Sequence, residues 1–196
     1  MKVYNIHIQD PKVQINNFNF IVVPEHDRLE GENVIKSKGA IHYITDEEIQ
    51  GAKALAISKN VLTVILGGPN KYYSFSLEEL KRLFHKIELL FLNRVEEIKI
   101  ISSRRTPESI VSFLRDRYKD NSKVIVDSSL FRKNYIEALA QAKKIIVTSD
   151  SISMLSEAAT TGVPIYLAKL KSYKNDHRFD SFLELFKRLN IIKDLE

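Results

Sequence analysis

The sequence contains no cysteine, which excludes disulfides, thiolate metal sites and cysteine nucleophiles. No apolar run approaches the length of a membrane span. The first residues, Met1 to His7, are too polar for a signal peptide. We therefore expect a cytoplasmic globular protein. Its 196 residues are enough to bury a hydrophobic core, and the length favours one domain or little more.

Positive charge is modest and unevenly distributed. The net charge is +5, but residues 1–60 carry 7 basic and 8 acidic side chains, whereas residues 61–196 carry 23 and 17. A basic excess of this size is compatible with an anionic small molecule or with peripheral contact at an anionic membrane surface. Because no Lys/Arg run is interleaved with aromatic residues, we do not expect a nucleic-acid partner. No metal-ligand cluster is evident, and we expect neither a metal nor a cofactor.

Two strands open the chain and lead into a loop rich in ionisable groups. Apolar alternation predicts strands at 4–8 and 18–23, and Pro24 ends the second. His26 and Asp27 follow directly. Histidine titrates near neutrality, so these two residues are candidate catalytic acid/base groups. The alternative is a solvated turn with local ion pairs.

A helix then connects the two parts of the chain. A short apolar run at 39–44 precedes Thr45-Asp-Glu-Glu48, a sequence that matches a capping box. The pattern predicts a helix from there to about Ser58. We accordingly divide the chain into residues 1–59 and residues 60–196.

From residue 61 onward, strand and helix patterns alternate five times. Short apolar runs predict strands at 61–66, 97–101, 123–126, 144–150 and 164–168. Helix-start patterns follow at Ser76, at Thr106 with Pro107, at Asn134, and at Ser149 or Asp150; a last amphipathic helix covers about 179–189. This order predicts an α/β fold with a doubly wound parallel sheet and right-handed crossovers.

Three of the predicted strands end in residues suited to a ligand. Gly67 and Gly68 let a backbone come close to a ligand, or merely form a tight turn. Arg104 and Arg105 are suited to bidentate phosphate binding, or are surface arginines with acidic neighbours. In a doubly wound sheet these positions share the edge where ligands bind.

The third position is the start of the helix after residue 148. Free N–H groups amid small polar residues make such a helix start an anion site, and Asp150, Ser151 and Ser153 lie there. Glu157 lies further along the helix, where its carboxylate could accept hydrogen bonds from a sugar diol. The alternative is a capped core helix with a solvated Glu157. The convergence of the three positions on one edge favours a ligand site.

Several separated motifs resemble the elongated-mitochondria family. These are Pro24-Glu-His-Asp27, Asn33-Val-Ile35, Gly39-Ala-Ile-His42, Leu66-Gly-Gly68, Ser103-Arg-Arg-Thr-Pro107, Val147-Thr-Ser-Asp-Ser151, Ser153-Met154 and Ser156-Glu-Ala158. Plant members are described as mitochondrial fission proteins, and bacterial members are classed as predicted glycosyltransferases. The resemblance implies a Rossmann-like carboxyl-terminal lobe of a GT-B-type fold, together with a partial amino-terminal lobe.

The resemblance also implies roles for individual residues. Gly67, Gly68, Ser151 and Ser153 would hold the diphosphate of a nucleotide sugar or nucleoside diphosphate, and Glu157 its ribose. Family members carry a longer amino-terminal lobe, so we expect a complementary lobe on another chain as a partner and no catalysis by this chain alone. The rival hypothesis is a non-catalytic, membrane-associated interaction protein of the mitochondrial-fission type.

Overall fold

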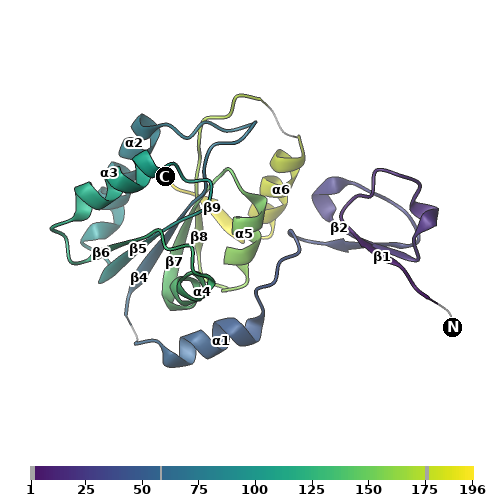
Figure 1. Cartoon of the computed structure of the whole chain (residues 1–196), viewed down its shortest axis with the longest axis horizontal. Helices are drawn as coiled ribbons and strands as arrows, with labels where there is room; N and C mark the ends of the chain where they lie inside the picture. Colours follow the sequence, from purple (N-terminus) through teal and green to yellow (C-terminus); the bar gives the residue numbers. More distant parts are fainter. Residues whose placement is uncertain (1–2, 58, 175–176) are drawn as a thin grey trace.

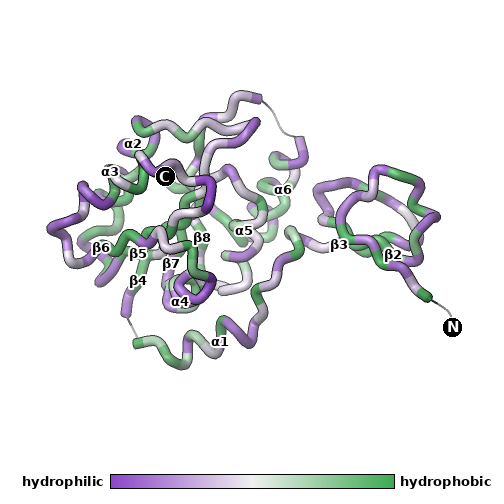
Figure 2. Tube along the Cα trace, viewed as in Figure 1, coloured by the Kyte–Doolittle hydropathy of each residue, from purple (hydrophilic) through white to green (hydrophobic). Residues whose placement is uncertain are grey.

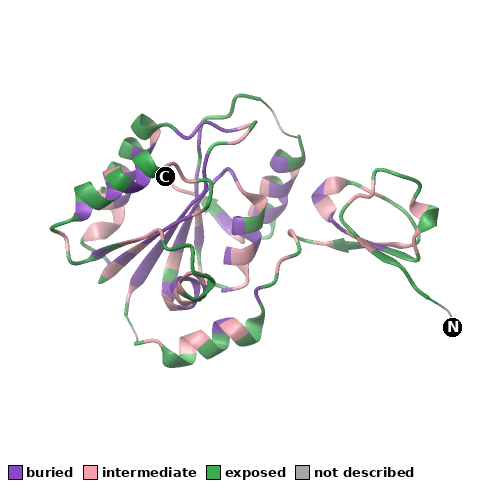
Figure 3. Ribbon diagram, in the orientation of Figure 1, coloured by how far each residue is buried: buried purple, intermediate pink, exposed green. Residues whose placement is uncertain are grey.

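A computed structural model describes residues 3–57, 59–174 and 177–196. It contains two parallel sheets, a small one near the amino terminus and a larger one that forms the body of the molecule (Figure 1). The strands of the larger sheet are largely buried, whereas those of the small sheet are buried only in part (Figure 3). The α/β, Rossmann-like fold class is therefore confirmed.

The larger sheet has six strands in the order β6-β5-β4-β7-β8-β9, and every neighbouring pair is parallel. All six residues of the central strand β4 are buried. The direction of winding reverses between β4 and β7, so the crevice outside their carboxyl ends is the topological switch point. The strands are β4 (Val61–Leu66), β5 (Glu97–Ser102), β6 (Val124–Asp127), β7 (Ala142–Thr148), β8 (Ile165–Ala168) and β9 (Ile192–Asp194).

Helices cover both faces of this sheet. One face packs against α2 (Leu77–Ile87) and α3 (Glu108–Tyr118), with Leu80, Phe84 and Leu114 among the buried side chains. The other face packs against α1 (Asp46–Leu55), α4 (Arg132–Gln141), α5 (Ile152–Ala159) and α6 (His177–Arg188). A π-helical turn, Glu88–Leu92, extends α2.

The small sheet has three parallel strands in the order β1-β2-β3, namely β1 (Ile6–Ile8), β2 (Phe20–Pro24) and β3 (Val34–Ser37). Two single 3₁₀ turns, Ile15–Asn17 and Glu25–Asp27, lie in its connections. Only a few of its side chains are buried, among them Ile21 and Val23. Apolar segments of β2 and β3 are visible in Figure 2.

The two parts meet at α5 and α6. Asp27 forms an ion pair with Arg178 of α6, and Arg28 donates to Ser181 Oγ at 2.6 Å. The ring of His26 packs edge-on against Phe182, with centroids 5.3 Å apart. On α5, Ser156 Oγ accepts a hydrogen bond from the Ala40 backbone N–H at 2.9 Å.

The two capping boxes are confirmed. The Thr45 and Ser76 side chains each accept from the backbone N–H three residues on. The Glu48 and Glu79 carboxylates in turn accept from the backbone N–H groups of Thr45 and Ser76. Helix α1 ends at Leu55, and Ser58 lies outside the described residues. Strands β3 and β9 were not predicted, and the apolar run at 39–44 is irregular rather than a strand.

Three predicted helix caps were wrong. Thr106 does not cap α3, because its hydroxyl donates to the backbone carbonyl of Gly67 and accepts from Ser103 N–H. Asn134 lies inside α4 and donates to Asp127 instead. The N-cap of α5 is Ser151, not Ser149 or Asp150. In each case the polar side chain is engaged in a different contact.

Candidate functional site

At the switch point, the loop after β4 is joined to the end of β7. The Gly67 N–H donates to Thr148 Oγ1 at 2.8 Å, and the Gly68 N–H donates to Asp150 Oδ2 at 2.9 Å. Thr148 in turn donates its hydroxyl proton to Asp150 Oδ1 at 2.7 Å. The Asp150 side chain is completely buried. Both glycine amides are therefore already occupied by acceptors from the chain itself.

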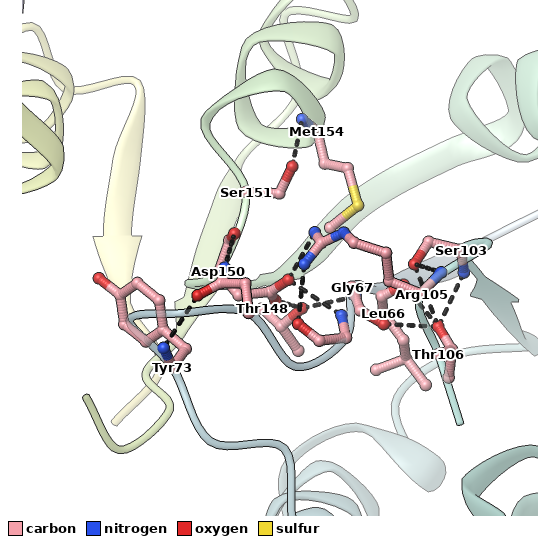
Figure 4. A network of polar contacts seen from close by, with 12 residues as sticks. Leu66, Gly67, Tyr73, Ser103, Arg105, Thr106, Thr148, Asp150, Ser151 and Met154 are labelled. Atoms are coloured by element: carbon pink, nitrogen blue, oxygen red, sulfur yellow. Dashed lines mark hydrogen bonds and ion pairs between the residues drawn. The ribbon is translucent and has the colours of Figure 1, made fainter. Parts of the chain in front are cut away.

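Arg105 completes this cluster. Its guanidinium donates to Asp150 Oδ2 and to the Gly68 carbonyl, each at 2.8 Å. Figure 4 shows the Arg105 and Asp150 side chains facing each other beside Gly67. Hydrogen bonds of this kind to an ionised carboxylate are among the stronger ones in proteins. Asp150 thus places a negative charge where the sequence predicted a bound phosphate.

Close approach explains why glycine occupies both loop positions. A Cβ at Gly67 would lie 1.9 Å from Asp150 Oδ2, and one at Gly68 would lie 2.0 Å from the Arg105 carbonyl oxygen. Real Cβ atoms do not approach other atoms this closely. The two glycines therefore allow contact with the chain's own groups, which is the structural one of the two alternatives raised by the sequence.

A cavity of about 350 Å³ opens beside this cluster, at the carboxyl ends of β4, β5 and β6. Its floor is formed by strand-end residues, and one wall comes from the segment after β6. The other wall comes from α5. Its lining includes Ile65, Ile101, Ser103, Arg104, Asp127, Leu130, Phe131, Asn134, Tyr135, Met154 and Glu157.

Glu157 lies half-buried in the wall of the cavity. Its Oε2 accepts the Tyr135 hydroxyl at 2.8 Å. Burial, followed by the nearby charge of Glu157 and this hydrogen bond, raises the pKa of Tyr135 well above its usual value. Tyr135 therefore stays protonated at physiological pH and holds the carboxylate in place. Within the described residues Oε1 has no hydrogen-bond partner, so it is free to accept from a ligand.

Arg104 and Arg105 differ in what they contact. Arg105 is paired with Asp150, whereas Arg104 is exposed, lines the cavity and makes no ion pair among the described residues. Arg104 is therefore the available cation at this edge. The opposite wall is fixed by Asp127, whose carboxylate accepts from Ser129 N–H and Asn134 Nδ2, each at 2.7 Å. Burial alone would raise the pKa of Asp127, but these hydrogen bonds lower it overall.

The remaining predicted ligand residues lie outside this cavity. Ser151 caps α5 by accepting from Met154 N–H, and Ser153 is exposed on the helix surface. Neither lines the cavity. The predicted convergence on one sheet edge is seen in the contacts among Gly67, Thr148, Asp150 and Arg105. Of the predicted ligand residues, Arg104 and Glu157 line the cavity.

His26 and Asp27 lie at the junction with α6. The His26 side chain is 3% exposed and the Asp27 side chain 4% exposed, and Asp27 is paired with Arg178. A general base must reach the proton that it removes. A catalytic role for these residues stays a prediction, and it requires that this junction open to a substrate.

Tyr135, Asp127 and Phe131 were not predicted as site residues. Phe131 is 68% exposed at the cavity, next to Leu130, whose φ of +59° places it in the left-handed region. The sequence offered one usable signal, the Asp127-Ser-Ser129 segment directly after a predicted strand. The contact between Tyr135 and Glu157 could not be predicted from the sequence, because the two residues lie on different helices and meet only in the folded chain.

A larger groove, of about 830 Å³, lies between α1 and α4. Its charged residues are of both signs, and Lys59 is already paired with Glu97 and Arg132 with Glu48. It lies away from the switch point. Since few of its polar groups are left to converge on a ligand, we regard the smaller cavity as the candidate site.

The described residues contain no helix long and apolar enough to cross a membrane. They also contain no group of three or more His, Asp or Glu side chains placed to hold a metal ion.

Comparison with known proteins identifies the family. The model of the mitochondrial fission ELM1 family matches residues 1–196. The chain belongs to this family. An uncharacterized protein of Rickettsia prowazekii is 35% identical over 151 residues, covering 73% of this chain and 42% of that protein. The mitochondrial fission protein ELM1 of Arabidopsis thaliana is 25% identical over 194 residues, covering 84% and 45%. This ELM1-family chain thus spans less than half the length of these curated relatives.

Two solved structures share the fold. The Acinetobacter baumannii MurG structure matches with a TM-score of 0.55 at 15% identity, covering 98% of this chain and 53% of MurG. The UDP-GlcNAc 2-epimerase of Methanocaldococcus jannaschii matches with a TM-score of 0.50 at 15% identity, covering 86% and 55%. At this identity the likeness shows the fold alone. The ELM1-family chain therefore has a GT-B-type, glycosyltransferase-like fold.

Proposed function

We propose that this ELM1-family chain binds a nucleotide sugar, with the nucleoside in the cavity between the ends of β4–β6 and helix α5. One observation carries the proposal. Glu157 and Arg104 line the same cavity at the ligand-binding edge of the sheet, and among the described residues one Glu157 oxygen and the Arg104 guanidinium have no partner. The name of one structural neighbour, UDP-GlcNAc 2-epimerase, contains such a compound and supports this choice of ligand.

Each wall of the cavity suits one part of the ligand. The ribose hydroxyls would donate to Glu157, which the Tyr135 hydroxyl holds in place. Arg104 would pair with a phosphate of the diphosphate. The exposed Phe131 ring offers a face on which a base can stack. A volume of about 350 Å³ lies at the lower end of the usual range for ligand sites, so the sugar would extend beyond this cavity.

Glycosyl transfer would additionally need an acceptor site and a base. If the chain is active, positive groups stabilise the leaving diphosphate as an acceptor hydroxyl attacks the sugar. Arg104 would supply that charge in this site. Because His26 and Asp27 are closed off at the α6 junction, we propose binding without turnover by this chain alone.

Thermal-shift titration with the four common nucleoside diphosphates and their nucleotide sugars tests the proposal. A ligand at about 100 times its Kd stabilises the folded chain by about 2.7 kcal/mol. Glu157→Gln should weaken binding by about tenfold or more, because the ligand hydroxyls would then donate to a neutral amide instead of a charged carboxylate. Glu137→Gln, a partly exposed residue of α4 that does not line this cavity, is the matched control and should bind like the wild type.

Two results would contradict nucleotide binding in this cavity. One is the absence of any shift with all of these ligands. The other is a shift that Glu157→Gln and Arg104→Ala leave unchanged, because the ligand would then lie elsewhere.

A second candidate function is peripheral contact with an anionic membrane, as in a non-catalytic interaction protein. A groove of about 790 Å³ on the β8–β9 side of the sheet favours it. Arg94, Lys144 and Lys193 line this groove, and none of them forms an ion pair with another described residue. Lysines near an anionic bilayer surface each contribute about 1 kcal/mol of attraction.

A further inference from the structure

One face of the small sheet is apolar and open to solvent. The strand register pairs Ile6 with Phe20, Ile8 with Val22, and Val22 with Ile35. Because neighbours across a sheet share a face, these five side chains lie on one side. We call them the apolar face. Ile6 is 64% exposed, Ile8 55%, Phe20 43% and Ile35 52%.

The opposite face is covered by the sheet's own connections. Ile21 and Val23 are fully buried there, and His7 packs on Phe18 with ring centroids 4.8 Å apart. Right-handed crossovers between strands that follow in the order β1-β2-β3 place both connections on the same side. Figure 1 shows these connections arching over one side of the strands. The apolar face therefore receives no cover from residues 9–19 or 24–33.

Strand β1 also has an open edge. In the described part of the chain it pairs with β2 alone. The Gln9 N–H donates to the Val22 carbonyl at 2.8 Å, and the Asn5 carbonyl accepts from Phe20 N–H at 3.3 Å. Alternation along a parallel strand then directs the backbone groups of Ile6 and Ile8 away from β2. Parallel sheets with a bare apolar face and an open edge are rare in isolation.

A single polypeptide segment could both cover the apolar face and pair with the open edge of β1. In the larger sheet, α2 and α3 connect the strands on one side of the switch point, and α5 and α6 connect those on the other side and cover the opposite face. By the same rule, strands added at β1 in the opposite winding direction would place their helices on the apolar face. We propose that β1 and the apolar face bind an α/β polypeptide segment, which extends the sheet from β1 and covers it with amphipathic helices.

A second copy of this chain does not meet both requirements. If it pairs through β1, its connections cover only its own strands and leave the apolar face bare. If two apolar faces pack together, both β1 edges stay open. The comparisons favour a larger unit: MurG matches 98% of this chain, including the small sheet, and has nearly as much polypeptide again outside the matched part.

The probe for this proposal is the part of the Rickettsia prowazekii relative that this chain does not match. It is co-expressed with the tagged 196-residue chain, and complexes are sized by light scattering and titrated for affinity. We expect a one-to-one complex in which the Ile6 and Ile8 amides become protected from hydrogen exchange. The double variant Ile8→Lys/Ile35→Lys should weaken it about 100-fold, because two apolar side chains can no longer be buried.

A matched double variant controls for the loss of exposed apolar residues. Leu55 and Ile57 are 89% and 79% exposed and lie outside the small sheet, so Leu55→Lys/Ile57→Lys should bind like the wild type. Both double variants should melt at the wild-type temperature, since the replaced side chains are more than half exposed. Three outcomes overturn the proposal: no complex, equal binding by both double variants, or a wild-type homodimer that Ile8→Lys/Ile35→Lys dissociates.

Discussion

Gly67 and Asp150 should be strongly coupled in their effects on stability. A methyl group at Gly67 would lie 1.9 Å from Asp150 Oδ2, 2.3 Å from Oδ1 and 2.4 Å from Cγ. To make room, the Asp150 carboxylate must rotate away from the loop, and because this side chain is 0% exposed it cannot do so without losing its partners inside the protein. Gly67→Ala therefore breaks the contacts of Asp150 as well as adding an atom.

The expected magnitude follows from the hydrogen bonds that are lost. Asp150 accepts from Gly68 N–H, Thr148 Oγ1 and Arg105 at 2.7 to 2.9 Å. Each such bond to a charged group contributes about 1.5 to 3 kcal/mol, and the Arg105 bond counts least because that side chain is 40% exposed. We expect Gly67→Ala to lower the free energy of unfolding by about 4 kcal/mol, and Asp150→Ala by about 3 kcal/mol.

The double variant separates this explanation from others. Asp150→Ala removes the three atoms that a Cβ at Gly67 would meet, so in that background Gly67→Ala should cost less than about 1 kcal/mol. The coupling energy is then about 3 kcal/mol. Urea unfolding followed by far-ultraviolet circular dichroism measures all four proteins. Gly51→Ala is the control: it is helical with no atom within 4 Å of the added Cβ, and it should stabilise by about 0.5 to 1 kcal/mol.

Additive effects of Gly67→Ala and Asp150→Ala, within about 0.5 kcal/mol, would refute this reasoning. Gly67 would then be needed for its backbone conformation and not for the approach of the carboxylate.

Two further predictions concern acid stability and membranes. The pKa of Glu88 lies below its ordinary value of 4.5, chiefly because Arg117 donates a hydrogen bond to the carboxylate. Burial opposes this effect, and the hydrogen bond from Tyr118 adds to it. A depressed pKa means that the folded state binds the proton less tightly than the unfolded state, so this stabilisation is present above pH 4.5 and is lost as pH falls below it. The melting temperature should drop in that range, and Glu88→Gln should drop less steeply; an unchanged slope contradicts the assignment. If the groove lined by Arg94, Lys144 and Lys193 contacts membranes, the chain should co-sediment with vesicles containing anionic lipid regardless of nucleotide. Lys144→Glu/Lys193→Glu should then reduce binding about tenfold or more. Equal sedimentation with neutral vesicles would argue against this contact.

The larger sheet was predictable because its strands are apolar and separated by capped amphipathic helices. Val61–Leu66 is buried at every position, and a continuous apolar run of this length can be predicted as a strand from its own residues alone. Strand β9 contains only Ile192, Lys193 and Asp194, which is too short for any periodicity. Residues 34–37 form a strand by pairing with β2, whereas the more apolar run at 39–44 stays irregular, and nothing in the local sequence signals this difference.

The predicted helix caps failed where tertiary contacts compete for the capping group. The Thr106 hydroxyl donates to backbone carbonyls at the end of β4, about forty residues earlier in sequence, instead of capping α3. Asn134 is similarly recruited by Asp127. Sequence reasoning treats capping as local, and it has no means of weighing a distant carbonyl.

Part of the candidate site could be predicted from the sequence. Parallel topology alone brings the ends of β4, β5 and β7 to one edge, so the neighbourhood of Gly67, Arg104 and Glu157 follows from strand order. That Thr148 and Asp150 rather than a ligand accept from the glycine amides does not follow, because it depends on the rotamers of side chains about 80 residues further along the chain. The pairing of Tyr135 with Glu157 is hidden for the same reason.

The central position of β4 has a consequence for synthesis on the ribosome. Ile65 pairs with Ile101 on one side and with Val147 on the other, 36 and 82 residues later in the chain. At about 5 to 20 residues per second, the β7 side of this apolar strand stays unpaired for about 4 to 16 s after β4 emerges. Nascent chains should therefore need a chaperone until β7 has been made, and truncation before residue 142 should yield aggregates.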